Sequence, residues 1–201
     1  MFLRFLYPAH ARQLQIDAGR ILLRAPLPGD WKAWAELRAE SREFLQPWEP
    51  TWPRDALTRQ AYHRRLGYYA GEWRQSSGYA LFLLRQEDQE LLGGISLLNV
   101  RRGVAQTASL GYWIGRPHAR QGYMTEAISG VLDFAFDRLG LHRVEAACLP
   151  HNAPSRGLLA KSGFREEGFA REYLRINGRW QDHVLFAILR DDPRPPIEGL
   201  P

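Results

Sequence analysis

Short apolar runs, separated by charged or glycine-bearing turns, dominate the first half of this chain. The first run, RILLRA at residues 20–25, predicts a strand. Three further runs predict an antiparallel meander, and they lie at residues 78–85, 90–100 and 106–115. Two helices are expected in between, one capped by Asp30 and one across about residues 55–73. Alternating Pro and Trp at residues 47–53 predict a stiff aromatic loop between these helices.

The period of the pattern changes at Thr125, where apolar residues begin to recur at helical spacing with polar residues on the opposite side. A strand at 142–149 and a short helix at 154–163 follow. A hairpin turned at Asn177-Gly178 closes the pattern, because both residues tolerate the left-handed backbone of a tight turn. The order of elements predicts an α/β fold, with a mixed sheet and helices on its faces.

The length of 201 residues suits one domain, which we expect across residues 1–190. Residues 191–201 contain four prolines, three of them at positions 193, 195 and 196, so a disordered tail is predicted there. The chain contains 45% hydrophobic and 24% charged residues, as a folded globular protein does.

The expected location is the cytoplasm. The sole cysteine, Cys148, has no partner for an internal disulfide, which fits a reducing compartment. Arg4 and Pro8 interrupt the apolar opening of the chain, so it does not match a signal peptide. No apolar stretch reaches the roughly 18 residues of a bilayer span, and no membrane partner is expected.

A net charge of +5 and a pI near 9.6 permit a nucleic acid, a membrane surface or a phosphorylated cofactor as partner. A basic but merely solvated surface accounts for the charge equally well. The charge alone does not choose among these readings.

The most informative stretch is GYWIGRPHARQGYMTEAI at residues 111–128. A strand leads into a turn that holds Arg116, His118, Arg120 and Gly122, and the amphipathic helix starts directly after it. Unpaired N–H groups and the positive dipole end at a helix N-terminus attract anions, and a preceding glycine lets the backbone approach them closely. The pattern therefore indicates a phosphate site, although a glycine in a tight turn would look the same.

Other familiar chemistries are missing from the sequence. It contains neither of the two glycine-rich nucleotide-binding signatures, GxxxxGK[ST] and GxGxxG. CxxC, HExxH and GxSxG are also absent and the six histidines are scattered, so we expect no metal site and no serine nucleophile. Cys148 lies inside an apolar strand and is read as a core residue.

The runs GYWIG, RQGYMTEA, PHNAPSRGLLAKSGF and GFAREY with RWQDHVLFAI together resemble the GNAT acetyltransferase superfamily. SREFLQPWEP, LPHNAPSRGLLAKSGF and GFAREYLRINGRWQDHVL are similar, within it, to the Rim branch of ribosomal-protein N-acetyltransferases. The resemblance covers about residues 18–190, with the elements in the same order.

The resemblance implies a mostly antiparallel sheet that splays open between its fourth and fifth strands, here residues 106–115 and 142–149, with acetyl-CoA inserted in the gap. It assigns cofactor binding to Tyr112, Trp113 and Ile114 beside the pantetheine arm, to Arg120, Gln121, Gly122, Tyr123, Met124 and Thr125 at the pyrophosphate, and to Asn152 near the thioester. Arg116, His118 and Arg120 would add positive charge near the phosphates. The loop departs from the superfamily pattern at Ala119 and Met124.

For catalysis, the resemblance points to Asn152 and Ser155 at the thioester end of the cofactor. Helix capping alone would also explain both residues. Leu159 stands where some relatives carry a tyrosine acid, so Ser155, or a water that it holds, is expected to assist the departing thiol. Glu49 and Glu172 are the two candidate bases, and each is equally readable as a solvated charge.

The implied reaction is direct acetyl transfer to the N-terminal α-amine of a protein. The Rim resemblance further implies a ribosomal protein as acceptor and association with the ribosome. Two alternatives stay open: an acetyltransferase acting on a polyamine, a drug amine or lysine, and a non-catalytic RNA- or ribosome-binding module. The sequence leaves the oligomeric state open.

Overall fold

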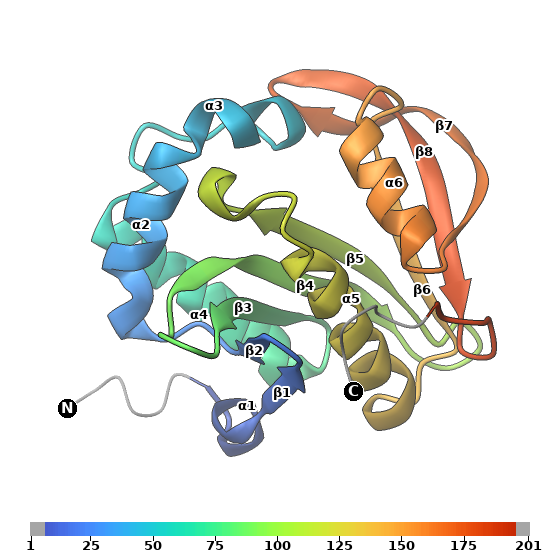
Figure 1. The fold of residues 1–201 in the computed structure, drawn as a ribbon, viewed down its shortest axis with the longest axis horizontal. Coiled ribbons are helices and arrows are strands. Elements are labelled where there is room, and N and C mark those ends of the chain that lie inside the picture. The colour runs from blue at the N-terminus through green and yellow to red at the C-terminus, as the bar shows by residue number, and fades with distance from the viewer. Residues whose placement is uncertain (1–6, 196–201) are drawn as a thin grey trace.

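A computed structural model describes residues 7–195, and within them eight strands form one sheet (Figure 1). The strands are β1 (Gln15–Ala18), β2 (Ile21–Arg24), β3 (Tyr79–Arg85), β4 (Leu91–Arg101), β5 (Thr107–Ile114), β6 (Arg143–Cys148), β7 (Arg165–Ile176) and β8 (Arg179–Leu189). The α-helices are α1 (Ala9–Gln13), α2 (Trp31–Glu40), α3 (Arg42–Leu45), α4 (Arg59–Gln75), α5 (Tyr123–Asp133) and α6 (Ala153–Lys161).

The strand order is β1-β2-β3-β4-β5-β6-β8-β7, and in the described chain every neighbouring pair is antiparallel except β5 and β6. The parallel pair is short: residues 107–110 of β5 pair with residues 143–146 of β6. Beyond Leu110, β5 pairs only with β4, while β6 continues along β8. The sheet is therefore mixed and mostly antiparallel, and it opens between the two strands at which the sequence predicts the gap.

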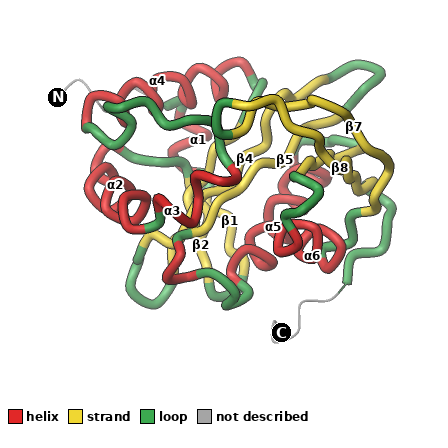
Figure 2. Tube along the Cα trace, turned by 90° about the horizontal axis from the view of Figure 1, so that it is seen from above, coloured by secondary structure: helices red, strands yellow, loops and turns green. Residues whose placement is uncertain are grey.

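Helices cover both faces of the sheet, as Figure 2 shows with α4 on one side and α5 and α6 on the other. On the α5 face, Ile128 and Val131 pack with strand residues such as Leu83 and Ile95 in the larger core cluster. The smaller cluster joins α2 and α4 to the opposite face, through Trp34, Leu37, Tyr62, Leu66, Phe82 and Leu91. The central strands are consequently buried on both sides, which makes them a rigid support for the residues at their ends.

Several element boundaries differ from the predicted ones. β1 is an additional strand, so the gap lies between the fifth and sixth strands rather than the fourth and fifth. Asp30 precedes α2 as predicted, but its carboxylate does not cap that helix and instead accepts two 2.8 Å hydrogen bonds from the Arg24 guanidinium. α4 begins only after Thr58, whose hydroxyl accepts from the Ala61 amide at 3.2 Å.

The closing hairpin has the predicted turn. Asn177 and Gly178 both adopt positive φ, at 44° and 80°, as a two-residue turn of this kind requires. After β8, Asp192 accepts from the Leu189 amide at 2.9 Å and pairs with Arg165 at 2.9 Å. The rest of the predicted tail, residues 196–201, lies outside the described residues.

Candidate active site

The loop before α5 exposes backbone N–H groups at a helix N-terminus. Gly122 occupies the N-cap position with φ 88°, and Arg120 is also left-handed, with φ 65°. The Gly122 carbonyl accepts from the amides of Thr125 and Glu126 at 2.9 and 3.3 Å. Across residues 7–195, the amides of Gly122, Tyr123 and Met124 have no acceptor. Such orphan donors at the positive end of a helix are suited to an anionic ligand.

Arg20, from the turn between β1 and β2, holds this loop in place. Its Nη2 donates to the Gln121 carbonyl at 2.8 Å, and its Nε donates to Oε1 of the buried Glu126 at 2.7 Å. The guanidinium also lies 4.6 Å from the centre of the Tyr123 ring. The residue thus ties the loop carbonyl, the first turn of α5 and the sheet edge together.

A cavity of about 300 Å³ runs from this loop along α5 towards the end of α6. Three basic side chains border it, those of Arg20, Lys161 and Arg194, and the α5 residues Thr125 and Ser129 line it as well. Glu126 is the acidic residue of the lining, and its carboxylate is already paired with Arg20. The charge and the hydroxyl groups of the lining suit a phosphorylated ligand.

The side chains of Tyr123 and Met124 point away from any ligand at this loop. Both are buried in the larger core cluster, so these two residues offer the loop only their backbone amides. This accounts for the departure from the superfamily pattern at Met124, since its side chain fills the core. His118 is also buried, with Nε2 3.7 Å from Oε1 of Glu90, which turns it away from the phosphate loop.

Within the part of the chain that the structure describes, the end of β5 has one edge without a strand partner. Residues 111–114 pair with β4 alone, which leaves the edge towards β6 available for a ligand in extended conformation. The Tyr112 and Ile114 side chains pack on the α5 side of the sheet, and the Trp113 ring packs on the α2 side. Trp113 lies so closely over β4 that an added Cβ at Gly94 would sit 2.4 Å from its Nε1.

Across the gap, Asn152 and Ser155 lie at the start of α6. The Asn152 side chain caps this helix by accepting from the Ser155 amide at 3.1 Å, so the capping role is present. The Ser155 hydroxyl instead forms a 2.7 Å hydrogen bond with the hydroxyl of Tyr112. Burial raises the pKa of the neighbouring Cys148 thiol, and the Ser155 hydroxyl opposes that change.

The two candidate bases have different surroundings. Both carboxylate oxygens of Glu49 accept hydrogen bonds from the Arg38 guanidinium, and Oε2 also accepts from Trp52 Nε1 at 2.7 Å. Arg38 itself is buried, with the rings of Trp52 and Trp113 centred 4.3 and 4.9 Å away. Glu49 is therefore engaged in an enclosed ion pair rather than free in solvent.

Glu172 is exposed and lies in a bulge of β7. Its φ of 47° is left-handed, and its amide donates to Asp182 Oδ1 at 2.8 Å. Within the described chain its carboxylate has no hydrogen-bond or ion-pair partner. Tyr173, next in sequence, packs edge-on against His183 with 5.7 Å between ring centres.

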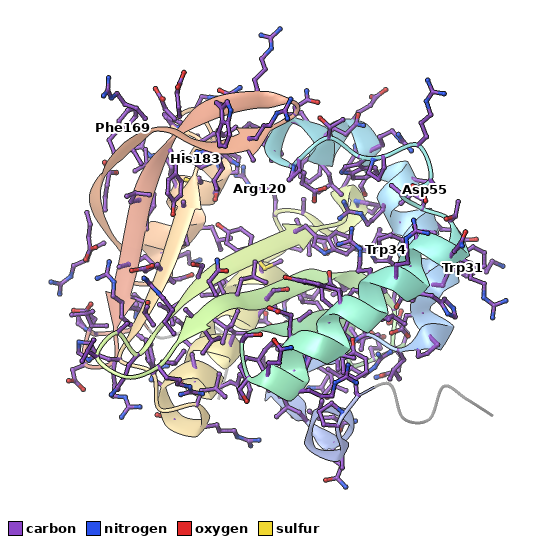
Figure 3. All side chains as sticks on the ribbon, turned by 180° about the vertical axis from the view of Figure 1, so that it is seen from behind. Trp31, Trp34, Asp55, Arg120, Phe169 and His183 are labelled. Atoms are coloured by element: carbon purple, nitrogen blue, oxygen red, sulfur yellow. The ribbon has the colours of Figure 1, made fainter. Side chains whose placement is uncertain are left out.

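The aromatic loop that contains Glu49 reaches across the open end of the sheet to the hairpin. The Asn177 amide donates to the Glu49 carbonyl at 2.9 Å, and the rings of Trp48 and His151 lie 5.5 Å apart. Figure 3 shows the two halves that this loop joins, with Trp34 on the α2 half and Phe169 and His183 on the hairpin half. The loop, α6 and the hairpin together frame the outer end of the gap.

Sequence reasoning did not identify Arg20, Arg38 or the Tyr112 hydroxyl as parts of the site. A signal for Arg38 is present in the sequence, because it shares the apolar stripe of α2 with Trp34 and Leu37. An arginine in a buried stripe requires a buried anion, and Glu49 supplies it. Arg20 and Glu126 are 106 residues apart, and no local pattern connects them.

Two further features concern classes of partner. In the described residues, no helix is long and apolar enough to cross a membrane. Nor do three or more His, Cys, Asp or Glu side chains gather there in an arrangement that could hold a metal ion.

Comparison with known proteins gives a consistent result. The family profile described as an acetyltransferase (GNAT) domain matches residues 20–165. The [ribosomal protein uS5]-alanine N-acetyltransferase of Escherichia coli is 34% identical over 193 residues, which cover 95% of this chain and 98% of that protein. The probable N-acetyltransferase YjcK of Bacillus subtilis is 37% identical over 156 residues, covering 78% and 86% of the two chains.

Among solved structures, Mycobacterium smegmatis RimJ in complex with CoA-disulfide superposes with a TM-score of 0.81. Its sequence is 34% identical, and the match covers 88% of this chain and 85% of that one. The similarity therefore extends from the local motifs to the fold of most of the chain.

Proposed function

This chain belongs to the GNAT acetyltransferase family, and we propose that it transfers the acetyl group of acetyl-CoA to the N-terminal α-amine of a ribosomal protein. The observation that carries the proposal is the match over 95% of the chain to an enzyme named for alanine acetylation of a ribosomal protein. The geometry is compatible with it, since the sheet opens between β5 and β6 and a helix N-terminus with unpaired amides follows β5. We place the reaction in the cytoplasm, where ribosomal proteins are made, and expect the enzyme to meet its acceptor on or near the ribosome.

The three parts of the site suit the three parts of acetyl-CoA. The amides of Gly122, Tyr123 and Met124 suit the pyrophosphate, and Arg20 keeps the loop in the conformation that presents them. The free edge of β5 at Tyr112–Ile114 suits the amides of the pantetheine arm. Ser155 then lies at the inner end of the gap, where we place the thioester.

The transfer needs a neutral amine and a stabilised leaving thiolate. An α-amine has a reference pKa of about 7.7 to 8.0, so it loses its proton near neutral pH far more easily than lysine, at about 10.4. We assign proton removal to Glu172, because its carboxylate has no partner among residues 7–195, whereas both oxygens of Glu49 are engaged by Arg38 and Trp52. The Ser155 hydroxyl donates a hydrogen bond to the departing sulfur.

Glu172→Gln should lower kcat about 10- to 100-fold at pH 7. This is at the low end of general-base effects, because an α-amine is a weak base and loses its proton easily near neutral pH. The difference in kcat between the variant and the wild-type protein should shrink as pH rises through about 8, because the amine there loses its proton to solvent without a base. A kcat profile from pH 6 to 9 measures this. Glu49→Gln is the matched variant, and it should change stability without changing the shape of the profile. The opposite pattern would make Glu49 the base.

The acceptor assignment predicts a preference among peptides. A peptide with a free N-terminal alanine should be acetylated, and the same peptide with a blocked N-terminus and an internal lysine should react at least about 100-fold more slowly at pH 7. Mass spectrometry locates the acetyl group, and thiol release from acetyl-CoA gives the rate. Spermidine in the same assay tests a small amine. Preferential reaction of the lysine peptide or of spermidine would reject the N-terminal assignment.

A further inference from the structure

The hydroxyl of Tyr112 spans the gap at its inner end. Tyr112 lies on β5 two residues beyond the last pair with β6, and Ser155 lies in the first turn of α6. Their oxygens are 2.7 Å apart, so one side-chain hydrogen bond joins the two elements that flank the opening. The remainder of the Tyr112 ring packs against the core on the α5 side, which fixes the position of the hydroxyl.

The surroundings of the two hydroxyls indicate which of them donates. Burial raises the pKa of Tyr112 to about 12, so the phenol keeps its proton throughout the neutral range. Among residues 7–195, the acceptor available to that proton is Ser155 Oγ. A buried O–H without an acceptor is costly, so the phenol is the donor in this pair. The hydrogen of Ser155 is then left for a second acceptor, either the neighbouring Cys148 sulfur or a ligand in the gap.

We propose that Tyr112 is a positioning residue for acetyl transfer, which acts by holding the Ser155 hydroxyl with its hydrogen directed into the gap towards the leaving sulfur. The inference rests on the proposed function, because that function places the thioester beside Ser155. Two properties of the pair support it. A hydroxyl that accepts one hydrogen bond loses rotational freedom, and it also becomes a stronger donor through cooperativity.

The step balances without an acyl-enzyme. The amine nitrogen attacks the thioester carbon, the C–N bond forms, and the C–S bond breaks with its electron pair on sulfur. The thiolate carries this charge while it accepts from Ser155 Oγ–H, and it takes a proton from water as the product leaves. The amine loses one proton, which passes through Glu172 to water, so the numbers of protons taken up and released are equal. Tyr112 keeps its own proton, as a phenol with a raised pKa should beside a thiolate of pKa near 8.5.

A double-mutant cycle with the full chain tests the proposal. Tyr112→Phe removes only the hydroxyl and should lower kcat about tenfold, with the affinity for acetyl-CoA unchanged. Ser155→Ala should lower kcat about 10- to 100-fold, because it removes the donor itself. Adding Tyr112→Phe to Ser155→Ala should have no further effect, because Tyr112 acts only through Ser155. Tyr68→Phe, an exposed hydroxyl deletion on α4, should leave kcat unchanged.

Three results would overturn the proposal: an unchanged kcat in Tyr112→Phe, a loss of acetyl-CoA affinity without a loss of kcat, or losses that multiply in the double variant. The cycle is run with the alanine peptide and again without acceptor, where slow hydrolysis of acetyl-CoA still releases the thiol. Coupling in hydrolysis together with no peptide acetylation would reject the proposed acceptor and support the role of Tyr112. A wild-type protein that releases no thiol in either assay would overturn both.

Discussion

Gly122→Val should weaken binding of acetyl-CoA about 10- to 100-fold. A left-handed φ of 88° strains any side chain, and a β-branched one most, while the new Cβ would sit 3.0 Å from Arg20 Nη2. The loop must move to relieve both, and the movement would misdirect the amides to which we assign the pyrophosphate. Each lost hydrogen bond to a charged group is worth about 1.5 to 3 kcal/mol, which sets the range. Isothermal titration with acetyl-CoA measures it.

The same strain should also destabilise the protein, by about 1 to 3 kcal/mol, so a control for stability is needed. Gly103→Val provides it, because Gly103 has a similar φ of 64° with nothing within 4 Å of a new Cβ, and it lies in the turn at the other end of β5. This variant should lose stability and keep its affinity. Equal affinities in the two variants would show that Gly122 serves only the turn.

Arg38→Met should lower the free energy of unfolding by about 3 kcal/mol, which corresponds to roughly 10 °C in Tm for a chain of this size. The variant keeps most of the volume that packs against Trp52 and Trp113 but removes the cation, and it leaves the enclosed Glu49 carboxylate with Trp52 Nε1 as its remaining side-chain donor. The hairpin contact to Glu49 should loosen as well, which raises the KM for the peptide acceptor.

Two matched variants separate the buried pair from ordinary surface charge. Arg64→Met breaks the exposed pair with Asp55 and should cost about 1 kcal/mol or less. Adding Glu49→Gln to Arg38→Met should restore part of the lost stability, because it removes the unpaired charge. Urea denaturation of the four proteins gives the comparison. Equal losses of stability in Arg38→Met and Arg64→Met would show that the Arg38–Glu49 pair contributes no more to stability than an exposed ion pair.

Local signals in the sequence account for most of the fold. The meander, the amphipathic helix and the Asn177-Gly178 turn each depend on neighbouring residues, and the structure confirms all three. β1 was missed because its four residues, QIDA, are too few to establish an alternation. The prediction that Asp30 caps α2 considers only its position directly before the helix. In the fold, Arg24 on β2 lies within hydrogen-bond distance and binds the Asp30 carboxylate instead.

The candidate site was only partly predictable, for a physical reason. The turn at Gly122 and the helix that starts after it could be predicted because both are encoded in consecutive residues. The bonds of Arg20 to Glu126, Arg38 to Glu49 and Tyr112 to Ser155 join residues 106, 11 and 43 positions apart. Such contacts depend on which elements the sheet brings together, and no single segment contains that information.

The bulge at Glu172 also bears on the behaviour of the protein in concentrated solution. β7 is an edge strand of twelve residues, and it exposes Phe169, Tyr173 and Leu174. An unbroken edge of this length would be a template for intermolecular β-pairing and aggregation. Its register with β8 breaks twice, and the left-handed backbone at Glu172 bends the donors and acceptors out of line. The irregularity that carries the proposed base should therefore also disfavour self-association along this edge.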